Sequence, residues 1–260
     1  MKAFFRRGSV QTALWVLAII LLWELSSRLG LVSAYLLPPF SKVCVQMVHE
    51  LRTSTLALQV LNSLVVVVEG FLISFAIAIL LTVLCTWSSV AQSLCNALCT
   101  ILNPLPGIAL LPLVMIWFGV NSMAMLFLIV HGVLWPLLTN LLAGFRSTPA
   151  LYRDFAKNIG LSPLRLVFDI LVFAVMPYFI SGFRIGWGRA WRALISAEMI
   201  FGMIGTLGGL GFYIYTYRAY GNITNVLVGV LIIVIIGIVV DQLFNVVERK
   251  TVKKWGMSNG

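Results

Sequence analysis

The chain has 260 residues, of which 61% are hydrophobic and only 10% carry a charge. Ordinary soluble domains do not reach this composition, so a soluble enzyme is excluded and an all-α polytopic membrane protein is expected. The net charge of +10 does not indicate nucleic-acid binding, because the basic residues are dispersed and form no compact basic domain.

Six apolar runs are long enough to cross a bilayer as helices, and we expect them to form one transmembrane domain over residues 1–260. The runs cover residues 11–29, 58–86, 94–118, 122–144, 172–201 and 224–247. Three clusters, before the first run, between the fourth and fifth runs, and after the sixth, hold 11 of the 18 basic residues. Because cytoplasmic segments carry an excess of Lys and Arg, both termini and the loop at residues 146–171 are predicted to lie inside.

The first run can be interpreted as a retained span or as a cleaved signal peptide. Basic residues precede it, and the sequence 32–34 weakly resembles a signal-peptidase site. The run is long for a signal peptide, however, and Trp23 and Glu24 are typical of a span that ends at the membrane interface. We therefore favour a retained span, followed by an extended external segment at Pro38-Pro39 and a short amphipathic external helix over residues 41–52.

The third run contains prolines that interrupt helical hydrogen bonding. The sequence Asn103-Pro104-Leu105-Pro106-Gly107 lies within it, and Pro112 follows. Because proline leaves a backbone carbonyl without its helical partner, two interpretations stay open: an ordinary kinked helix, or a span that is broken near a cavity.

Isolated polar groups in the apolar runs are expected to be structural. Glu69 and His131 are too far apart to indicate a proton relay, so a packed, hydrogen-bonded role is favoured. Asp241 and Glu248 are expected to neutralise the two basic residues that follow them. The cysteines lack CxxC spacing and are expected to be small apolar fillers, with no redox or metal role: Cys44, Cys85, Cys95 and Cys99.

The loop at residues 146–171 has the pattern of two short helices joined by a turn. Its apolar residues follow spacings of four, five and four: Phe155, Ile159, Leu164 and Phe168. Gly160 and Ser162-Pro163 interrupt this pattern. Such an element could bind a cytoplasmic partner, or it could be a solvated loop anchored on lipid headgroups.

Within that loop, Asp154-Phe155-Ala156, three further residues, Gly160 and then Ile170-Leu171 and Pro177 resemble the EAA loop of permeases in binding-protein-dependent ABC importers. In that family the glutamate-alanine-alanine motif forms the coupling helix that lies in a groove of the ATPase subunit. The resemblance implies a coupling role for six residues: Asp154, Phe155, Ala156, Gly160, Ser162 and Pro163. Three positions depart from the pattern, which puts the detailed ATPase contacts in doubt: Asp154, Phe155 and Val172, where the family has glutamate, alanine and proline.

Further motifs extend the resemblance over nearly the whole chain, to the taurine, alkanesulfonate and nitrate branch of the family. They are Leu37-Pro38-Pro39, Pro104-Leu105-Pro106, Leu111-Pro112-Leu113, Trp117-Phe118-Gly119, the segment 181–186, Ala190-Trp191 and Ala197-Glu198-Met199. The resemblance implies a permease in a bacterial-type inner membrane that works with a second copy of itself, two cytoplasmic ATPase subunits and an external substrate-binding protein. The sequence has no GxxxxGK[ST] motif, so ATP hydrolysis is expected in the partner, and no cofactor is indicated.

The fifth run is unusually charged for a span. Gly182, Gly186 and Ala190 recur every four residues and predict a face for close helix packing. Arg184, Gly188 and Arg192 follow a neighbouring face, with Arg189 one step aside. Arginine is expensive in hydrocarbon, so these side chains are expected to line a cavity, form ion pairs or reach the interface.

The resemblance implies structural or gating roles for Arg184 and Glu198. Arg189 and Arg192 lie outside the family pattern, and attraction of an anionic substrate, internal pairing and snorkelling stay open for them. Glu198 follows Arg192 by six residues, too far for a pair within one helix, so we expect it to pair across a subunit interface, for example with Arg189 of another chain. The glycines between residues 202 and 211 predict a flexible external turn, with no strand before it to suggest a dinucleotide site.

Three functions remain to be compared. Import of a small anion, such as a sulfonate or a nitrate-like solute, is favoured by the resemblance. Import of a pyrimidine vitamin precursor by the same mechanism is an alternative. An ion-coupled secondary transporter is a third, but such proteins commonly contain two matching halves, which this sequence does not show.

Overall fold

The computed structural model describes residues 8–147, 158, 160–161 and 172–253. Its regular structure within these ranges is helical. The helices are α1 (Gly8–Arg28), α2 (Phe40–Thr53), α3 (Leu56–Trp87), α4 (Ser89–Leu102), α5 (Gly107–Phe118), α6 (Ser122–Ser147), α9 (Val172–Phe201), α10 (Leu210–Ala219) and α11 (Ile223–Glu248), which ends in a π-helical turn, η2 (Arg249–Lys253).

All six apolar runs are mainly helical, with the third interrupted at residues 103–106, and α9 has the bounds predicted for the fifth run. In the described part of the chain, α3, α6 and α11 are each long and apolar enough to cross a membrane. The pair α4 and α5 could provide a fourth crossing as one bent span. Within the described residues, α1 and the arginine-rich α9 are not among the helices that meet this test, so six crossings stay a prediction.

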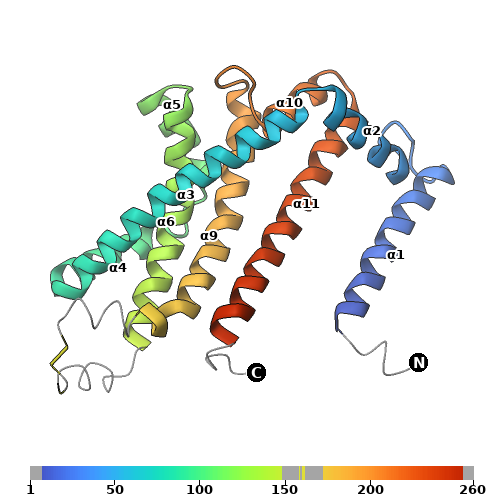
Figure 1. Cartoon of the computed structure of the whole chain (residues 1–260). Helices are drawn as coiled ribbons and strands as arrows, with labels where there is room; N and C mark the ends of the chain where they lie inside the picture. The colour runs from blue at the N-terminus through green and yellow to red at the C-terminus, as the bar shows by residue number, and fades with distance from the viewer. Residues whose placement is uncertain (1–7, 148–157, 159, 162–171, 254–260) are drawn as a thin grey trace.

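Helix α6 lies at the centre of the bundle, between α3 and α9, and also contacts α4 and α5 (Figure 1). The predicted small face of α9 packs directly against it. A methyl group added at Gly182 would meet the side chain of Leu137 at 3.1 Å, and one at Gly186 would meet Val133 at 3.1 Å. Ala190 is fully buried on the same face. These small residues let the two helix backbones approach closely, which confirms the predicted packing face.

Several helix ends lie at the same, lower level in Figure 1, where α1 stands apart from the other helices. They are the Gly8 end of α1, the Ser147 end of α6, the Val172 end of α9 and the C-terminal end of α11. The two short helices α2 and α10 lie at the opposite end. These helix ends therefore lie on the side opposite to α2 and α10, while the sidedness in a membrane stays a prediction.

The third run forms two helices that meet at a sharp break, and both interpretations of its prolines can be compared with this geometry. Helix α4 starts earlier, where the Ser88 hydroxyl accepts a hydrogen bond from the Ala91 N–H at 3.3 Å. Helices α4 and α5 meet at an angle of 103°. Pro104 and Pro106 lie in the break, where they lack the N–H that would continue helical hydrogen bonding. Of the two interpretations, the broken span is therefore the correct one, whereas Pro112 is accommodated inside α5.

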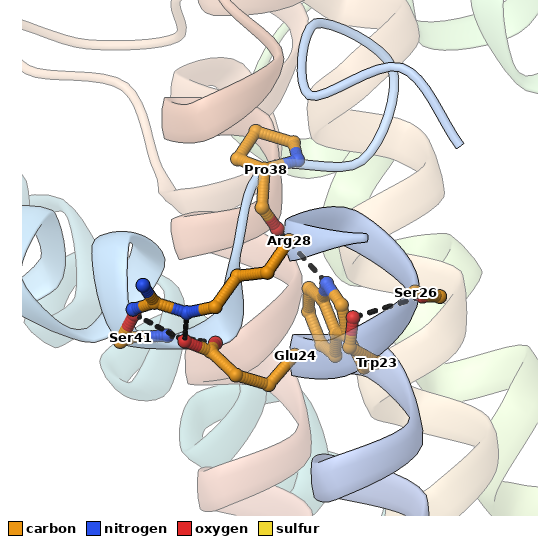
Figure 2. Close-up of polar contacts among 6 residues, drawn as sticks. All are labelled: Trp23, Glu24, Ser26, Arg28, Pro38 and Ser41. Atoms are coloured by element: carbon orange, nitrogen blue, oxygen red, sulfur yellow. Dashed lines mark hydrogen bonds and ion pairs between the residues drawn. The ribbon is translucent and has the colours of Figure 1, made fainter. Parts of the chain in front are cut away.

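Polar contacts fix the corner between α1 and α2, as Figure 2 shows. The Trp23 indole N–H donates to the Pro38 carbonyl at 2.9 Å. Glu24 accepts hydrogen bonds from the backbone N–H and the hydroxyl of Ser41, at 3.0 and 2.8 Å, and pairs with Arg28 at 2.6 Å. Because Ser41 lies in the first turn of α2, the Glu24 carboxylate satisfies a helix N-terminus that has no cap of its own. The predicted helix at residues 41–52 is confirmed as α2.

Candidate functional site

Most of the predicted coupling residues lie outside the described residues: Asp154, Phe155, Ala156, Ser162 and Pro163. Gly160 is described and has a φ of +67°, with open space where a Cβ would be. The left-handed backbone conformation is therefore the reason that glycine is favoured at this position. Left-handed glycines are common where a helical segment ends, and the sequence pattern predicts such an end at Gly160.

Arg184 of α9 contacts one face of α11 near its C-terminal end. Its guanidinium donates to the Asn245 side-chain oxygen at 2.7 Å and lies 3.5 Å from both Asp241 and Glu248. These three α11 residues are spaced by four and three, so they share one helix face. The expectation that Asp241 and Glu248 neutralise the adjacent basic residues Arg249 and Lys250 is thus wrong, because both carboxylates turn towards α9.

Arg189 forms hydrogen bonds to Asn103, at the break between α4 and α5. One guanidinium nitrogen donates to the backbone carbonyl of Asn103 at 2.9 Å and to its side-chain oxygen at 2.7 Å. Asn103 is the C-cap of α4, where unpaired carbonyls and the helix dipole favour a positive charge. Of the three roles left open for Arg189, internal pairing is the one that the structure contains.

Arg192, one turn further along α9, is exposed and forms no ion pair with any described residue. Gly188, on the same face, has open space beside it, and Ile185 is 43% exposed. This face of α9 is therefore uncovered in the single chain and carries an available cation.

Glu198 is buried inside one chain, with 2% of its surface exposed, so the expected pair with another subunit is wrong. The Ser63 hydroxyl lies 2.7 and 3.0 Å from its two oxygens, and the Gly211 N–H donates to it at 2.7 Å. Ser63 also accepts a hydrogen bond from the Leu210 N–H at 2.9 Å. The carboxylate thereby holds the first turn of α10 against α3 and α9.

Two more side chains of α3 hold the glycine-containing turn that precedes α10. Gln59 donates to the Leu207 carbonyl at 3.0 Å, and Asn62 donates to the Gly208 carbonyl at 2.9 Å. The turn predicted to be flexible is thus tied to α3 at its C-terminal end. The sequence did contain a signal, because Gln59, Asn62 and Ser63 form a polar stripe at helical spacing on an otherwise apolar helix.

Residues 51–253 match the family model described as binding-protein-dependent transport system inner membrane component. This chain belongs to that family. The permease is 30% identical to a putative ABC transporter permease protein of Methanocaldococcus jannaschii, over 89% of this chain and 86% of the relative. It is 25% identical to a putative aliphatic sulfonates transport permease protein of Bacillus subtilis (95% and 88% covered) and 28% identical to a bicarbonate transport system permease protein of Synechocystis (91% and 87% covered).

These similarities confirm the predicted importer branch, and they identify the chain as a permease subunit and not an enzyme. The match covers every helix from α3 to α11, including all the α9 contacts described above. Arg184, Arg189, Arg192 and Glu198 therefore lie inside the segment that matches the family model.

The permease has a cavity of about 530 Å³ between α4 and α6. Asn103, at the break of the third run, is one of its lining residues, so the break does lie beside a cavity. Asn96, Thr100 and Thr139 also line this cavity, but they are separate polar positions within apolar runs, so the sequence pattern does not mark them.

The remaining polar predictions have mixed outcomes. Three cysteines are buried and free, and Cys44 is free and half-buried, as expected for fillers. His131 is buried, but neither ring nitrogen has a hydrogen-bond partner in the described part, so only the packing half of its prediction is confirmed. Glu69 is exposed on α3, which makes its predicted packed role wrong for the single chain.

Proposed function

We propose that this permease forms, with a second copy of itself, the membrane pathway of an ATP-driven importer of a small anion. Two cytoplasmic ATPase subunits supply the energy, and an external binding protein delivers the substrate. The observation that carries the anion assignment is Arg192, an exposed cation without a described partner on the uncovered face of α9. Relatives named for sulfonates and bicarbonate support it. No feature of the chain favours the pyrimidine precursor.

The proposed topology has six crossings, with α1, α3, the α4–α5 pair, α6, α9 and α11 in the membrane. The N- and C-termini and residues 146–171 lie in the cytoplasm, because those segments carry most of the basic residues. The arrangement of α1, α6, α9 and α11, whose corresponding ends lie at the same level in Figure 1, supports this assignment. On this proposal the α2–α10 end faces the binding protein, Arg184 joins the middle of α9 to α11, and Glu198 fixes the C-terminal end of α9.

Coupling to the ATPase is proposed to run through Asp154, Phe155 and Ala156, with Gly160 ending their helical segment. Arg184 then joins the middle of α9, the helix that follows this loop, to α11. We expect the charge reversal Asp154→Lys, and a bulky side chain in Gly160→Trp, to reduce co-purification of the ATPase. Asp169→Lys is the matched control, since it makes the same charge change in the same loop outside the motif. Equal co-purification of all three variants would refute the docking role.

Reconstitution tests the function as a whole. Proteoliposomes that contain the permease, its ATPase and its binding protein should take up radiolabelled ethanesulfonate, nitrate or bicarbonate only when ATP is present. Uptake of the same anion by the permease alone, driven by an ion gradient, would favour the secondary-transporter alternative instead.

A further inference from the structure

Two rows of residues that include polar side chains face each other across the cavity between α4 and α6. Asn96, Thr100 and Asn103 follow a spacing of four and three on α4. Thr139, Ala143 and Arg146 follow the same spacing on α6. Each row therefore lies along one side of its helix, and the two sides meet at one cavity of about 530 Å³. A ligand of a few non-hydrogen atoms fits in that volume.

The lining is rich in hydrogen-bond donors and has no acidic side chain. Arg146 is exposed and has no ion-pair partner among the described residues. Arg189 occupies both the backbone and side-chain oxygens of Asn103, which leaves the amide N–H groups of Asn103 for another partner. Thr100 and Thr139 direct their hydroxyl hydrogens to carbonyls of their own helices, at 2.9 and 2.8 Å, so they contribute polarity without a spare donor.

Asn96, Thr100 and Thr139 would be unfavourable against lipid. Arg146 lies in the last turn of α6, beside the loop proposed to be cytoplasmic, and supplies the positive charge of the lining. The same groups suit an oxyanion, because a guanidinium matches its planar oxygens and carboxamides add further N–H donors. We infer that this cavity binds the oxyanion group of a small substrate, such as a sulfonate, nitrate or bicarbonate. Arg146 and Asn96 contact the anion, and Arg189 acts as a positioning residue through Asn103. This inference rests on the proposed anion import and gives it a site.

Charged thiol reagents can measure the electrostatic character of the cavity. Ala143→Cys places a thiol in the lining, and Ala109→Cys places one on an exposed part of α5 as the matched control. The anionic reagent is 2-sulfonatoethyl methanethiosulfonate, and the cationic one is its trimethylammonioethyl analogue. We expect the ratio of anionic to cationic rates to be roughly tenfold higher at Ala143→Cys, as one nearby positive charge predicts.

Adding Arg146→Gln to Ala143→Cys should remove that preference. Both rates are followed by intact mass spectrometry in nanodiscs, after subtraction of the reactivity of the native cysteines. The same ratio at the two cysteine positions, or a preference that survives Arg146→Gln, would overturn the inference.

Competition distinguishes a soluble anion from a lipid headgroup, which shares the oxyanion chemistry. In phosphatidylcholine nanodiscs, methanesulfonate should slow the anionic reagent at Ala143→Cys and leave Ala109→Cys unaffected. Protection that appears only when phosphatidylglycerol is included, with no effect of methanesulfonate, would identify a lipid site and overturn the substrate inference.

Transport separates this inference from the proposed function. In the complete reconstituted complex, Asn96→Ala should raise KM for the anion several-fold, whereas Gln92→Ala, a neighbour outside the lining, should not. If the complex imports an anion but the cavity shows no anion preference, the site is wrong and the function stands. If the preference and the methanesulfonate protection are present without import, the site stands and the proposed function fails.

Discussion

Glu198 shows how a charged residue can be placed inside an apolar bundle. Its carboxylate is almost fully buried, and its oxygens are occupied by Ser63 and the Gly211 N–H. A buried carboxylate is tolerable only while such partners are present. The residue is therefore better explained as the fixed point between α9, α3 and α10 than as a contact to a second subunit.

Removing the hydroxyl of Ser63 tests this role. Ser63→Ala leaves Glu198 and the Leu210 N–H without their shared partner, so we expect a loss of about 1–3 kcal/mol in the free energy of unfolding. Thermal denaturation of the detergent-solubilised protein, followed by tryptophan fluorescence, measures the effect. Ser93→Ala, at an exposed position of α4, is the control and should leave the midpoint unchanged. A loss as small as that of the control would show that the hydroxyl is dispensable.

Gly209 approaches the same carboxylate so closely that a side chain does not fit. A methyl group there would overlap Glu198 and lie 2.5 Å from the Ser63 hydroxyl. Gly209→Ala should therefore destabilise the protein by about 1–3 kcal/mol through forced displacement of buried groups. Gly237→Ala provides a matched glycine substitution in α11, where an added methyl meets nothing within 4 Å. Its expected change is neutral or slightly stabilising, because alanine favours helix. Equal midpoints for the two variants would contradict the close approach.

At the level of helices, the sequence was sufficient for the parts that depend on apolar length. The bounds of α3, α6, α9 and α11 follow from runs of hydrophobic residues, and the small face of α9 follows from residues four apart. The prolines indicated a break at residues 103–107. The 103° angle between α4 and α5 could not be predicted, because it depends on the packing of α5 against α6 and on the contacts of Arg189. Helix α10 was missed because glycine dominates the segment just before it.

The polar partners could not be predicted for a related reason. Spacing along one helix gives the face on which a residue lies, but not the element that covers that face. Gln59 and Leu207 are separated by 148 residues, and Arg184 and Asn245 by 61. Only tertiary structure connects such positions, so Arg184 was recognised as constrained while its partners on α11 were assigned to nearby basic residues.

The Arg184 contacts join two helices and can be measured as a coupling between them. We expect a double-mutant cycle of Arg184→Gln and Asp241→Asn to give a coupling free energy of about 0.5–1 kcal/mol, modest because both side chains are partly exposed. Denaturation midpoints of the two single variants and the double variant supply the cycle. Arg184→Gln with Gln242→Ala, a neighbour outside the pair, is the control cycle. Additive effects in the first cycle would show that the ion pair does not join α9 to α11.

For the molecule as a whole, the distribution of apolar and polar surface divides the bundle into two kinds of face. Leu22 of α1, Leu72 of α3 and Leu243 of α11 are 68%, 61% and 59% exposed, as hydrocarbon-facing residues would be. Uncovered polar groups include Glu69 of α3 and Asp241 of α11, but they gather on α4, α6 and α9, with Arg192 among them. Such groups are stable only against water, an ion or another protein surface. The face formed by α4, α6 and α9 is therefore the one expected to line a pathway.

Arg189 and Arg192 provide the test at this scale, because one is engaged inside the chain and the other is not. Arg192→Ala should lower kcat/KM for anion import about tenfold, or about 1.4 kcal/mol, while the denaturation midpoint stays near that of the unchanged protein. Arg189→Ala should instead lower the midpoint, because the carbonyl and side-chain oxygens of Asn103 lose their donor.

Arg249→Ala removes an exposed arginine from the turn that follows α11, away from the end proposed to face the binding protein, and serves as the control for both. Import is measured in proteoliposomes with the ATPase and the binding protein, at matched amounts of incorporated permease. An Arg192→Ala complex that imports the anion as well as Arg249→Ala would show that Arg192 does not act on the substrate. A normal midpoint for Arg189→Ala would mean that the α4–α5 break keeps its shape through proline and packing alone. The two arginines, three residues apart on α9, therefore test two roles separately: Arg189 stabilises the fold at the α4–α5 break, and Arg192 is proposed to act on the substrate.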